Sequence, residues 1–559
     1  MTIDQACHSE ERTDEESPET QGILRGACSE RKASVEAQGV LRFAQDDRQG
    51  ENRAGPVQRP EYHPGPTMAA TPNRVLMIGV DAGDIAFIEA AGEALPNLRR
   101  VLATGRRFDL ESTAEVLTGS VWPTFYTGTL PGEHGVYHPI QWDPDAMHAR
   151  RVSEDWLYCE PFWLDLEREG ETVVAFDVPF TFPSRLGRGI EINGWGTHER
   201  LGPFFCSRAE VGRELRRRFG AHPMGHDTPV PRSRKHSEDA ARRLAEGAGT
   251  KGRIARWLLG AIDWSLFLVV LGETHRGGHV LWPEPGYGAF APPENAMRDV
   301  YRAVDGAVGE ILAGAPADAT VVVFSLHGME TNRSQGHFVR PVTDRVNASL
   351  VEGGSARRDD APRGGLVRML RVAVPGRLQH AIARAAPIQL LDWVSNREIT
   401  GGVDWKKTPG FALRPDLHGY LRLNLVGREK AGALEPGSER HRSYVEELRT
   451  AFRSLTTGEP RRPIVRDILS MRDVFHGSRS ALLPDLVVRW EKLPQATRVD
   501  SDAYGTISAE PDTGRCGEHR SRGFATLLGP WKDAALPPLA HGTDFPRFVR
   551  ALLGRAPVS

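Results

Sequence analysis

The chain has 559 residues, with 71 basic and 73 acidic side chains, so its formal charge is −2. This balance provides neither the basic excess typical of nucleic-acid binding nor the acidic excess of a solvating tail. Hydrophobic residues make up 40% and charged residues 26%, which is ordinary for a globular enzyme. Five cysteines, never spaced CxxC, exclude a disulfide framework and favour a reducing, cytoplasmic compartment. No run of 18 apolar residues occurs, so we expect no membrane partner.

The first 67 residues differ in composition from the rest of the chain. They are polar, rich in Glu, Arg, Gln and Ser, and show neither helical nor strand periodicity. We expect residues 1–67 to be a disordered extension. Met68 is a candidate for the true start, because the first predicted strand begins only a few residues later.

From residue 75 onward, short apolar runs alternate with amphipathic stretches. Continuous apolar strands that alternate with helices indicate a parallel sheet covered on both faces. In chain order, the sequence predicts strands over Val75–Val80, Thr172–Phe176, Trp264–Gly272 and Thr320–Ser325, and helices over Asn97–Ala103 and Pro292–Ala313.

The ends of these strands carry side chains that can bind a metal ion. Asp81 follows the first strand, residues 273–279 follow the third, and His327 follows the fourth. In such sheets ligands bind beyond the carboxyl ends of the strands. His275 and His279 are four residues apart and would share one face of a helix, as in other two-histidine zinc sites. The alternative is a pair of solvated helix histidines.

The segment Leu117–Val136 is rich in Thr, Ser and Gly before a short apolar stretch. Such residues could begin a helix whose free N–H groups face an anion. A threonine hydroxyl at this place could attack phosphorus if a metal lowered its pKa. Spacing alone does not separate this hypothesis from ordinary helix capping by Thr118 or Ser120.

This segment resembles the nucleophile region of the alkaline phosphatase superfamily, in its type I phosphodiesterase and nucleotide pyrophosphatase branch. Thr118 precedes Thr127-Gly128 by nine residues, and PGEHGV (131–136) follows. Three further stretches also resemble the family: VVVFSLHGM (321–329), GEHRSRGF (517–524) and the block over 404–437. The resemblance covers about residue 74 to the C-terminus.

The resemblance implies an α/β fold with an alkaline phosphatase-like core, a mostly parallel sheet with helices on both faces, and cap-like insertions. The hydrolase domain would span 68–559, with insertions at about 143–251 and 341–462. It also implies a two-metal site. Asp81, Thr118 and His327 fall at the positions of one metal, with Thr118 as the nucleophile, and His279 and His519 at those of the other.

Two positions depart from the family pattern. His275 and Leu326 stand where the family has aspartates. In a standard family site, two divalent ions and three aspartates give a net charge of about +1. Two ions with the single aspartate of this sequence would give a net charge of about +3. Either Glu273 or a residue from a loop joins the ligands, or only one ion binds well. His275, His279 and His519 would by themselves make an open catalytic zinc site. We therefore expect one or two divalent ions, with zinc as the expected metal.

The implied function is a metal-dependent hydrolase that cleaves phosphodiester or nucleotide pyrophosphate bonds through a phosphoryl-threonine intermediate. The expected partner is a small phosphate ester or nucleotide, not a nucleic acid. The candidate substrate-binding residues are Gly119, Ser120, Asn332, Arg520 and His198, with a turn, cap or surface ion pair as the structural alternative for each. The functional alternatives are a weak or inactive family member that binds a nucleotide or anionic ligand, and a phosphomonoesterase or phosphotransferase of the same fold.

Overall fold

The computed structural model describes residues 73–157, 159–184, 186–197, 201–225, 228–284, 290–350, 403–511 and 514–556. These residues fall within one compact unit, Pro72–Ala556. The predicted extension over 1–67, the candidate start at Met68 and the candidate ligand-binding residue His198 lie outside the described residues.

The main sheet has eight strands in the order β2-β20-β9-β1-β8-β5-β6-β7. The strands from β9 to β6 in this order run parallel, whereas β2, β20 and β7 pair antiparallel with their neighbours. The four predicted strands are the adjacent strands β9, β1, β8 and β5, so the predicted α/β fold with a mostly parallel sheet is confirmed. The strands are β1 (Val75–Val80), β2 (Arg106–Leu110), β5 (Val173–Phe176), β6 (Ile190–Asn193), β7 (Phe205–Cys206), β8 (Leu266–Leu271), β9 (Thr320–Ser325) and β20 (Gly523–Leu528).

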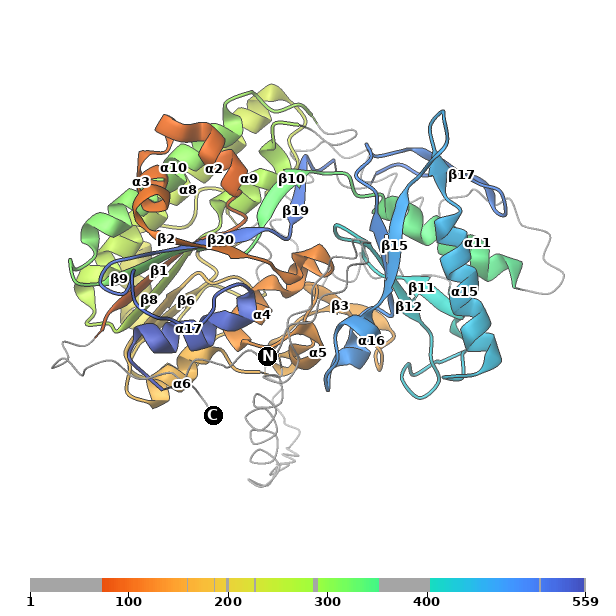
Figure 1. Ribbon diagram of the computed structural model, residues 1–559, viewed down its shortest axis with the longest axis horizontal. Coiled ribbons are helices and arrows are strands. Elements are labelled where there is room, and N and C mark those ends of the chain that lie inside the picture. Colours follow the sequence, from red (N-terminus) through yellow and green to blue (C-terminus); the bar gives the residue numbers. More distant parts are fainter. Residues whose placement is uncertain are drawn as a thin grey trace, which may run out of the picture. The chain divides into compact units, whose positions relative to one another are not determined.

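Both faces of this sheet are apolar, because successive side chains of a strand point to opposite sides. In β1, Leu76, Ile78 and Val80 belong to one buried cluster, and Val75 and Met77 to another. Helices cover each cluster (Figure 1). One side has α2 (Ile85–Ala91), α3 (Pro96–Thr104), α7 (Ala209–Phe219), α8 (Arg234–Ala261), α9 (Glu273–Leu281) and α10 (Ala296–Gly314); the other has α4 (Val121–Thr127), α6 (Phe162–Arg168) and α17 (Phe545–Leu552).

A second, antiparallel sheet in the order β11-β12-β16-β15 has its own apolar core with two helices. Its elements are β11 (Gly410–Ala412), β12 (Gly419–Leu423), β15 (Val465–Ser470), β16 (Leu486–Trp490), α11 (Val339–Ser349) and α15 (Glu439–Arg453). The smaller elements are β3 (Ile140–Asp143), β4 (His148–Arg151), β10 (Gly328–Thr331), β13 (Thr456–Thr457), β14 (Arg462–Pro463), β17 (Arg498–Ser501), β18 (Gly505–Ser508), β19 (Gly517–Arg520), α5 (Pro131–His134) and α16 (Met471–Val474).

These elements place the insertion boundaries differently from the expected ones. Residues 143–251 include β5, β6 and β7 of the main sheet, so this stretch is not one continuous insertion. The second sheet, in turn, extends beyond residue 462, because β15 and β16 follow that position. Polar residues explain part of the difference: β6 carries Glu191 and Asn193, which interrupt the apolar pattern that identifies a buried strand.

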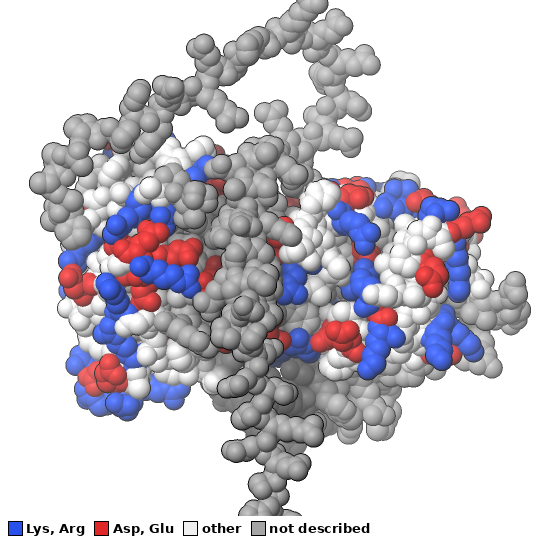
Figure 2. All heavy atoms as spheres, turned by 90° about the horizontal axis from the view of Figure 1, so that it is seen from below, with Lys and Arg blue, Asp and Glu red and all other residues white. Residues whose placement is uncertain are grey.

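None of the described helices is long and apolar enough to cross a membrane. On the face drawn in Figure 2, Lys and Arg alternate with Asp and Glu over the described residues. This mixture agrees with the near-zero formal charge of the chain.

A buried ion network fixes the start of α9. Lys251 of α8 places its Nζ 3.0 Å from Asp177 Oδ2, 3.3 Å from Glu273 Oε1 and 3.1 Å from the Val270 carbonyl oxygen. His222 Nε2 lies 3.2 Å from the same Glu273 oxygen. Burial by itself would raise the pKa of Glu273, but the Lys251 charge and the His222 hydrogen bond lower it to about 2. The carboxylate is therefore ionised and holds the first turn of α9 against α8.

We expect Lys251→Met to lower the free energy of unfolding by about 3–5 kcal/mol, because it leaves two buried carboxylates without their cation. Urea titration followed by circular dichroism measures the change. Lys235→Ala, at an exposed position of the same helix, is the control and should change stability by less than about 0.5 kcal/mol. Equal stability of the two variants would show that the network does not hold α9.

Candidate active site

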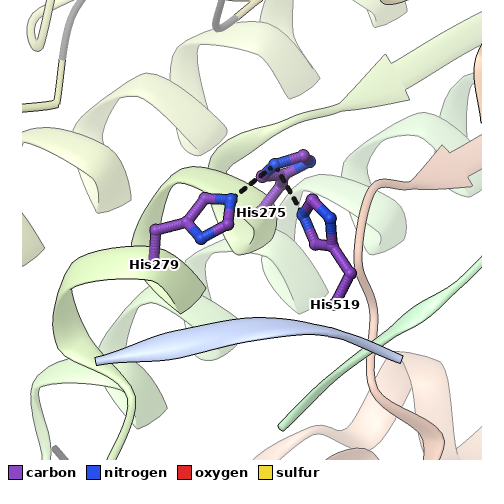
Figure 3. Close-up of side chains that lie close together, drawn as sticks. All are labelled: His275, His279 and His519. Atoms are coloured by element: carbon purple, nitrogen blue, oxygen red, sulfur yellow. Dashed lines mark hydrogen bonds between the residues drawn. The ribbon is translucent and has the colours of Figure 1, made fainter. Parts of the chain in front are cut away.

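Three histidines from two elements converge at the carboxyl end of the main sheet. His275 and His279 lie one turn apart on α9, which begins directly after β8. His519 lies on β19, which pairs with β10 just after β9. His275 Nε2 is 3.0 Å from Nε2 of His279 and 3.0 Å from Nε2 of His519 (Figure 3). Their facing nitrogens form a group that could hold one metal ion.

Gly517 allows α9 and β19 to approach this closely. A Cβ at Gly517 would lie 2.3 Å from the backbone carbonyl oxygen of Gly278, whereas a Cβ at Gly278 would meet the flexible end of Met329 on β10. Real Cβ atoms do not approach a backbone atom so closely, so a larger residue at position 517 would push β19 from the helix. Such a shift would separate His279 from His519.

Hydrogen bonds on the other ring nitrogens assign the protons of two of these histidines. His275 Nδ1 lies 2.9 Å from Asp81 Oδ2, and His279 Nδ1 lies 2.9 Å from the Gly517 carbonyl oxygen. A carboxylate and a carbonyl can only accept, so Nδ1 of each ring carries the proton. In the neutral rings both Nε2 atoms then present lone pairs to each other across 3.0 Å.

Two facing lone pairs repel unless a proton or a metal ion lies between them. Metal-binding histidines commonly donate their other ring N–H to a carboxylate or carbonyl, as both do here. Three histidines also bind zinc in known catalytic sites, where the fourth position is open. Nitrogens about 2.0–2.1 Å from zinc lie roughly 3.3 Å from one another in a tetrahedral arrangement. The donor set of this structure therefore fits a divalent ion such as zinc.

Both carboxylate oxygens of Asp81 contact neighbouring side chains. Its Oδ2 accepts from His275, and its Oδ1 accepts from Trp122 Nε1 at 3.0 Å and lies 3.4 Å from His327 Nε2. Burial alone would raise the pKa of Asp81, but His275 and then His327 hold it well below its usual value. Asp81 is therefore an ionised carboxylate that orients His275.

The second group of metal-capable side chains comprises Asp81, His275 and His327. It shares His275 with the first group, and that ring turns its protonated Nδ1 to Asp81 and its Nε2 to the other histidines. Leu326 contributes no ligand and belongs to the apolar cluster on one face of the main sheet. The group around His327 therefore contains the one carboxylate, but His275 turns a proton and not a lone pair toward it.

Glu273, the alternative carboxylate ligand, lies in the ion network with Lys251 and His222. It belongs to neither of the two groups of side chains that could hold a metal among the described residues. The structure thus places this carboxylate beneath α9, where it supports the helix.

Thr118 begins a short turn, η4 (Thr118–Ser120), that leads into α4. Its side chain is buried, and its hydroxyl donates to Asp416 Oδ2. One helical turn later, Trp122 donates to Asp81, so the same segment connects the hydroxyl to the histidine group. Gly119 packs tightly, because a Cβ there would lie 2.4 Å from the Tyr137 carbonyl oxygen.

Asp416 also lines a pocket of about 460 Å³ together with His275 and His279. Its lining includes Arg151, Arg276, Arg414 and Arg515, with Glu518 as a further acidic residue. Three of these arginines act on His138, whose pKa falls to about 3 mainly through burial and then through the charges of Arg414, Arg515 and Arg151. The pocket thus combines a metal-capable histidine group with an excess of cationic side chains.

The remaining candidate substrate-binding residues are placed as follows. Asn332 lines the pocket, but its Nδ2 donates to the Arg515 carbonyl at 3.2 Å and its Oδ1 accepts from Ser334 N at 3.0 Å. The Ser120 N–H donates to the Leu117 carbonyl at 3.1 Å, so it is engaged within the turn. Arg520 Nε lies 3.0 Å from Asp84 Oδ2, which corresponds to the ion-pair alternative.

Sequence reasoning missed Asp416 and the pocket arginines. Asp416 lies inside the block over 404–437 that resembles microbial family members, but it follows no predicted strand of the main sheet. Arg151 and Arg414 lie on or beside the short strands β4 and β11. The resemblance of that block to the family was the available signal, and it does not say which of its residues reaches Thr118.

We expect zinc to raise the unfolding temperature of the wild-type chain, because an ion held by the folded histidine group stabilises it by about 2.7 kcal/mol at one hundred times its dissociation constant. His519→Ala should lose this rise and its bound zinc, measured by differential scanning fluorimetry and elemental analysis. His148→Ala, at an exposed position of β4, should keep both. Wild-type zinc affinity in the His519 variant would contradict a site at these three histidines.

Comparison with known proteins identifies the family of this chain. The family model for type I phosphodiesterase / nucleotide pyrophosphatase matches residues 75–397. Phosphonoacetate hydrolase from Sinorhizobium meliloti 1021, in complex with phosphonoacetate, aligns with 12% identity and a TM-score of 0.49 over 86% of this chain and 96% of that chain. Human ectonucleotide pyrophosphatase/phosphodiesterase 5 aligns with 12% identity and a TM-score of 0.44 over 87% and 96%. A search of curated proteins found no match. Since the model matches more than half of the sequence, the chain belongs to the type I phosphodiesterase/nucleotide pyrophosphatase family.

Proposed function

We propose that the chain is a metal-dependent hydrolase that cleaves phosphodiester or nucleotide pyrophosphate bonds through a phosphoryl intermediate on Thr118. The observation that carries this proposal is the three-histidine group, in which Asp81 and the Gly517 carbonyl leave the facing Nε2 atoms of two rings without protons. Thr118 supports it, because its hydroxyl contacts a carboxylate that lines the same pocket as His275 and His279.

Charge counting favours one ion over two. One divalent ion on the three neutral histidines, with Asp81 beside them, gives 2 − 1, or about +1. Two divalent ions with the same single aspartate give 4 − 1, or about +3, and the mutual repulsion of the ions would be poorly compensated. We therefore place a single ion at His275, His279 and His519, with zinc as the preferred metal because imidazole ligands suit it.

A metal ion bound there would polarise a phosphoryl oxygen and supply an activated water at neutral pH. Asp81 orients His275 and would offset part of the positive charge of the ion. The Gly517 carbonyl orients His279. The buried contacts around these rings keep the ligand nitrogens in position before substrate arrives, so little reorganisation is needed on binding.

In the first step, Thr118 Oγ attacks phosphorus, an Oγ–P bond forms, and the P–O bond to the leaving alcohol or nucleotide breaks with its electron pair on the departing oxygen. As the bond forms, the hydroxyl proton passes from Thr118 to an acceptor beside it, and solvent protonates the departing oxygen. In the second step water attacks phosphorus and releases Thr118 with its hydroxyl restored. Phosphoryl transfer of this kind depends mainly on positioning and on charge stabilisation.

The pocket supports a small anionic substrate. Arg151, Arg414 and Arg515 line it, and guanidinium groups bind phosphate oxygens in bidentate fashion. Asn332 lines the same pocket, and its Nδ2 donates a hydrogen bond to the backbone carbonyl of Arg515. Nucleotides and phosphodiesters are the corresponding substrate class. We also propose a cytoplasmic location, because Cys206 and Cys516 form no disulfide within the described residues.

A second candidate function is a catalytically weak member that binds a nucleotide or another anion. Leu326 lies in the apolar cluster, and Asp81 is engaged by three neighbours, so the family's second metal position is depleted here. Such a protein would bind metal and anion but turn over little substrate.

We expect Thr118→Ala to abolish turnover of bis-p-nitrophenyl phosphate while its zinc content stays at the wild-type level, because the histidine group does not include Thr118. Thr118→Ser, which keeps a hydroxyl, should retain measurable activity. Release of p-nitrophenol gives the rate, and mass spectrometry of acid-quenched enzyme detects phosphoryl-threonine.

Undiminished hydrolysis by Thr118→Ala would remove Thr118 as the nucleophile. Stoichiometric zinc together with nucleotide binding, but no turnover in the wild type, would favour the weak family member. Absence of bound zinc would contradict the metal-dependent mechanism itself.

A further inference from the structure

The hairpin β11–β12 of the second sheet packs directly on the loop that carries Thr118. His418 Nε2 lies 2.9 Å from the Glu115 carbonyl oxygen, and the Tyr420 hydroxyl donates to the Val116 carbonyl at 3.3 Å. These two contacts fix the hairpin to the residues immediately before the nucleophile.

The tip of this hairpin is also held from its other side. Ser334 Oγ donates to the Asp416 carbonyl at 3.2 Å from outside the hairpin, and within the hairpin Leu413 N donates to the Tyr420 carbonyl at 2.9 Å. Asp416 therefore sits in a loop whose backbone is anchored at several points. Its side chain reaches Thr118 from a defined place.

The contact between Asp416 and Thr118 has a fixed direction. A carboxylate only accepts, so the Thr118 hydroxyl donates its proton to Asp416 Oδ2. Tyr420 lies beside both residues, and burial followed by the Asp416 charge raises its pKa well above the usual value. Tyr420 therefore remains a neutral phenol next to the nucleophile, and the carboxylate of Asp416 is the anionic group that contacts the hydroxyl.

The three-histidine group does not account for how the Thr118 hydroxyl would be activated. Leu326 cannot bind a cation, Asp81 is bonded to His275 and Trp122, and the three-histidine group does not contain Thr118. A hydroxyl that lacks a cation on its oxygen needs a base to take its proton as it attacks.

We propose that Asp416 is the proton acceptor for Thr118, so that this chain activates its nucleophile with a carboxylate from the second sheet instead of a second metal ion. The inference rests on the proposed function. As the Oγ–P bond forms, the proton passes from Thr118 Oγ to Asp416 Oδ2, and the bond electrons of the leaving group depart with its oxygen. In the second step, Asp416 returns the proton to Thr118 Oγ as water displaces it from phosphorus, and water releases one proton to solvent, which matches the proton that the leaving oxygen takes up. Protein kinases use an aspartate in the same chemical role toward an attacking hydroxyl.

Asp416→Asn tests this role with little change in shape, because asparagine keeps one acceptor oxygen but loses the charge. We expect one equivalent of zinc per chain in both wild type and variant, measured by elemental analysis. The kcat for bis-p-nitrophenyl phosphate should fall about 10²- to 10⁴-fold, the size of a general-base effect, with a small change in KM. Asp416→Glu, which keeps the carboxylate on a longer arm, should recover part of the loss.

Asp404→Asn is the matched control, because it removes one carboxylate from an exposed side chain ahead of the same hairpin. It should leave zinc content, kcat and KM at wild-type values. Rapid quench of each enzyme adds a direct readout: formation of phosphoryl-threonine should slow in Asp416→Asn and not in the control.

Two outcomes overturn the inference alone. One is an unchanged kcat in Asp416→Asn; the other is a wild type with two zinc ions whose Asn variant keeps only one, which would make Asp416 a metal ligand. A wild-type chain that binds zinc but hydrolyses neither phosphodiesters nor nucleotides would overturn the proposed function and this inference together.

Discussion

The hydrogen bond between Asp81 and His275 determines the chemistry of the site. Both groups are buried, the bond is 2.9 Å long, and it assigns the ring proton to Nδ1. Nε2 is thereby available to a cation, and Asp81 is used to support a ligand. A carboxylate at position 275 would have faced Asp81 as a second negative charge, which a proton or a cation would have to offset. The imidazole adds no charge and instead donates a hydrogen bond to Asp81.

Contacts at the start of α9 and along β19 fix this arrangement. Lys251 and His222 hold the first residue of α9 through buried contacts, and Gly517 lets β19 lie against the same helix. Buried polar networks of this type are costly when incomplete and rigid when complete. The ligand nitrogens are thus placed by the folding of the core, before any ion or substrate binds.

Continuous apolar strands could be predicted because they are buried on both faces, and the rule that ligands lie beyond strand ends then pointed to Asp81, His275 and His327. His519 was reachable only through a motif, since it lies on a short antiparallel ribbon with no apolar signature. Asp416 could not be found, because it is 298 residues from Thr118 and only the tertiary fold brings them together. Arg520 shows the opposite case: its positive charge suggested a contact with substrate phosphate, but in the structure its Nε lies 3.0 Å from Asp84 Oδ2.

The hairpin that contacts Thr118 has a consequence for how such a protein could diversify. Its residues belong to the accessory sheet, the region in which relatives of a hydrolase would be expected to vary most freely. Here that region reaches the Thr118 hydroxyl itself. Grafting a foreign cap onto this core would therefore exchange more than the residues that line the pocket: it would also remove Asp416, the group in contact with that hydroxyl, so cap and core can change only as a matched pair.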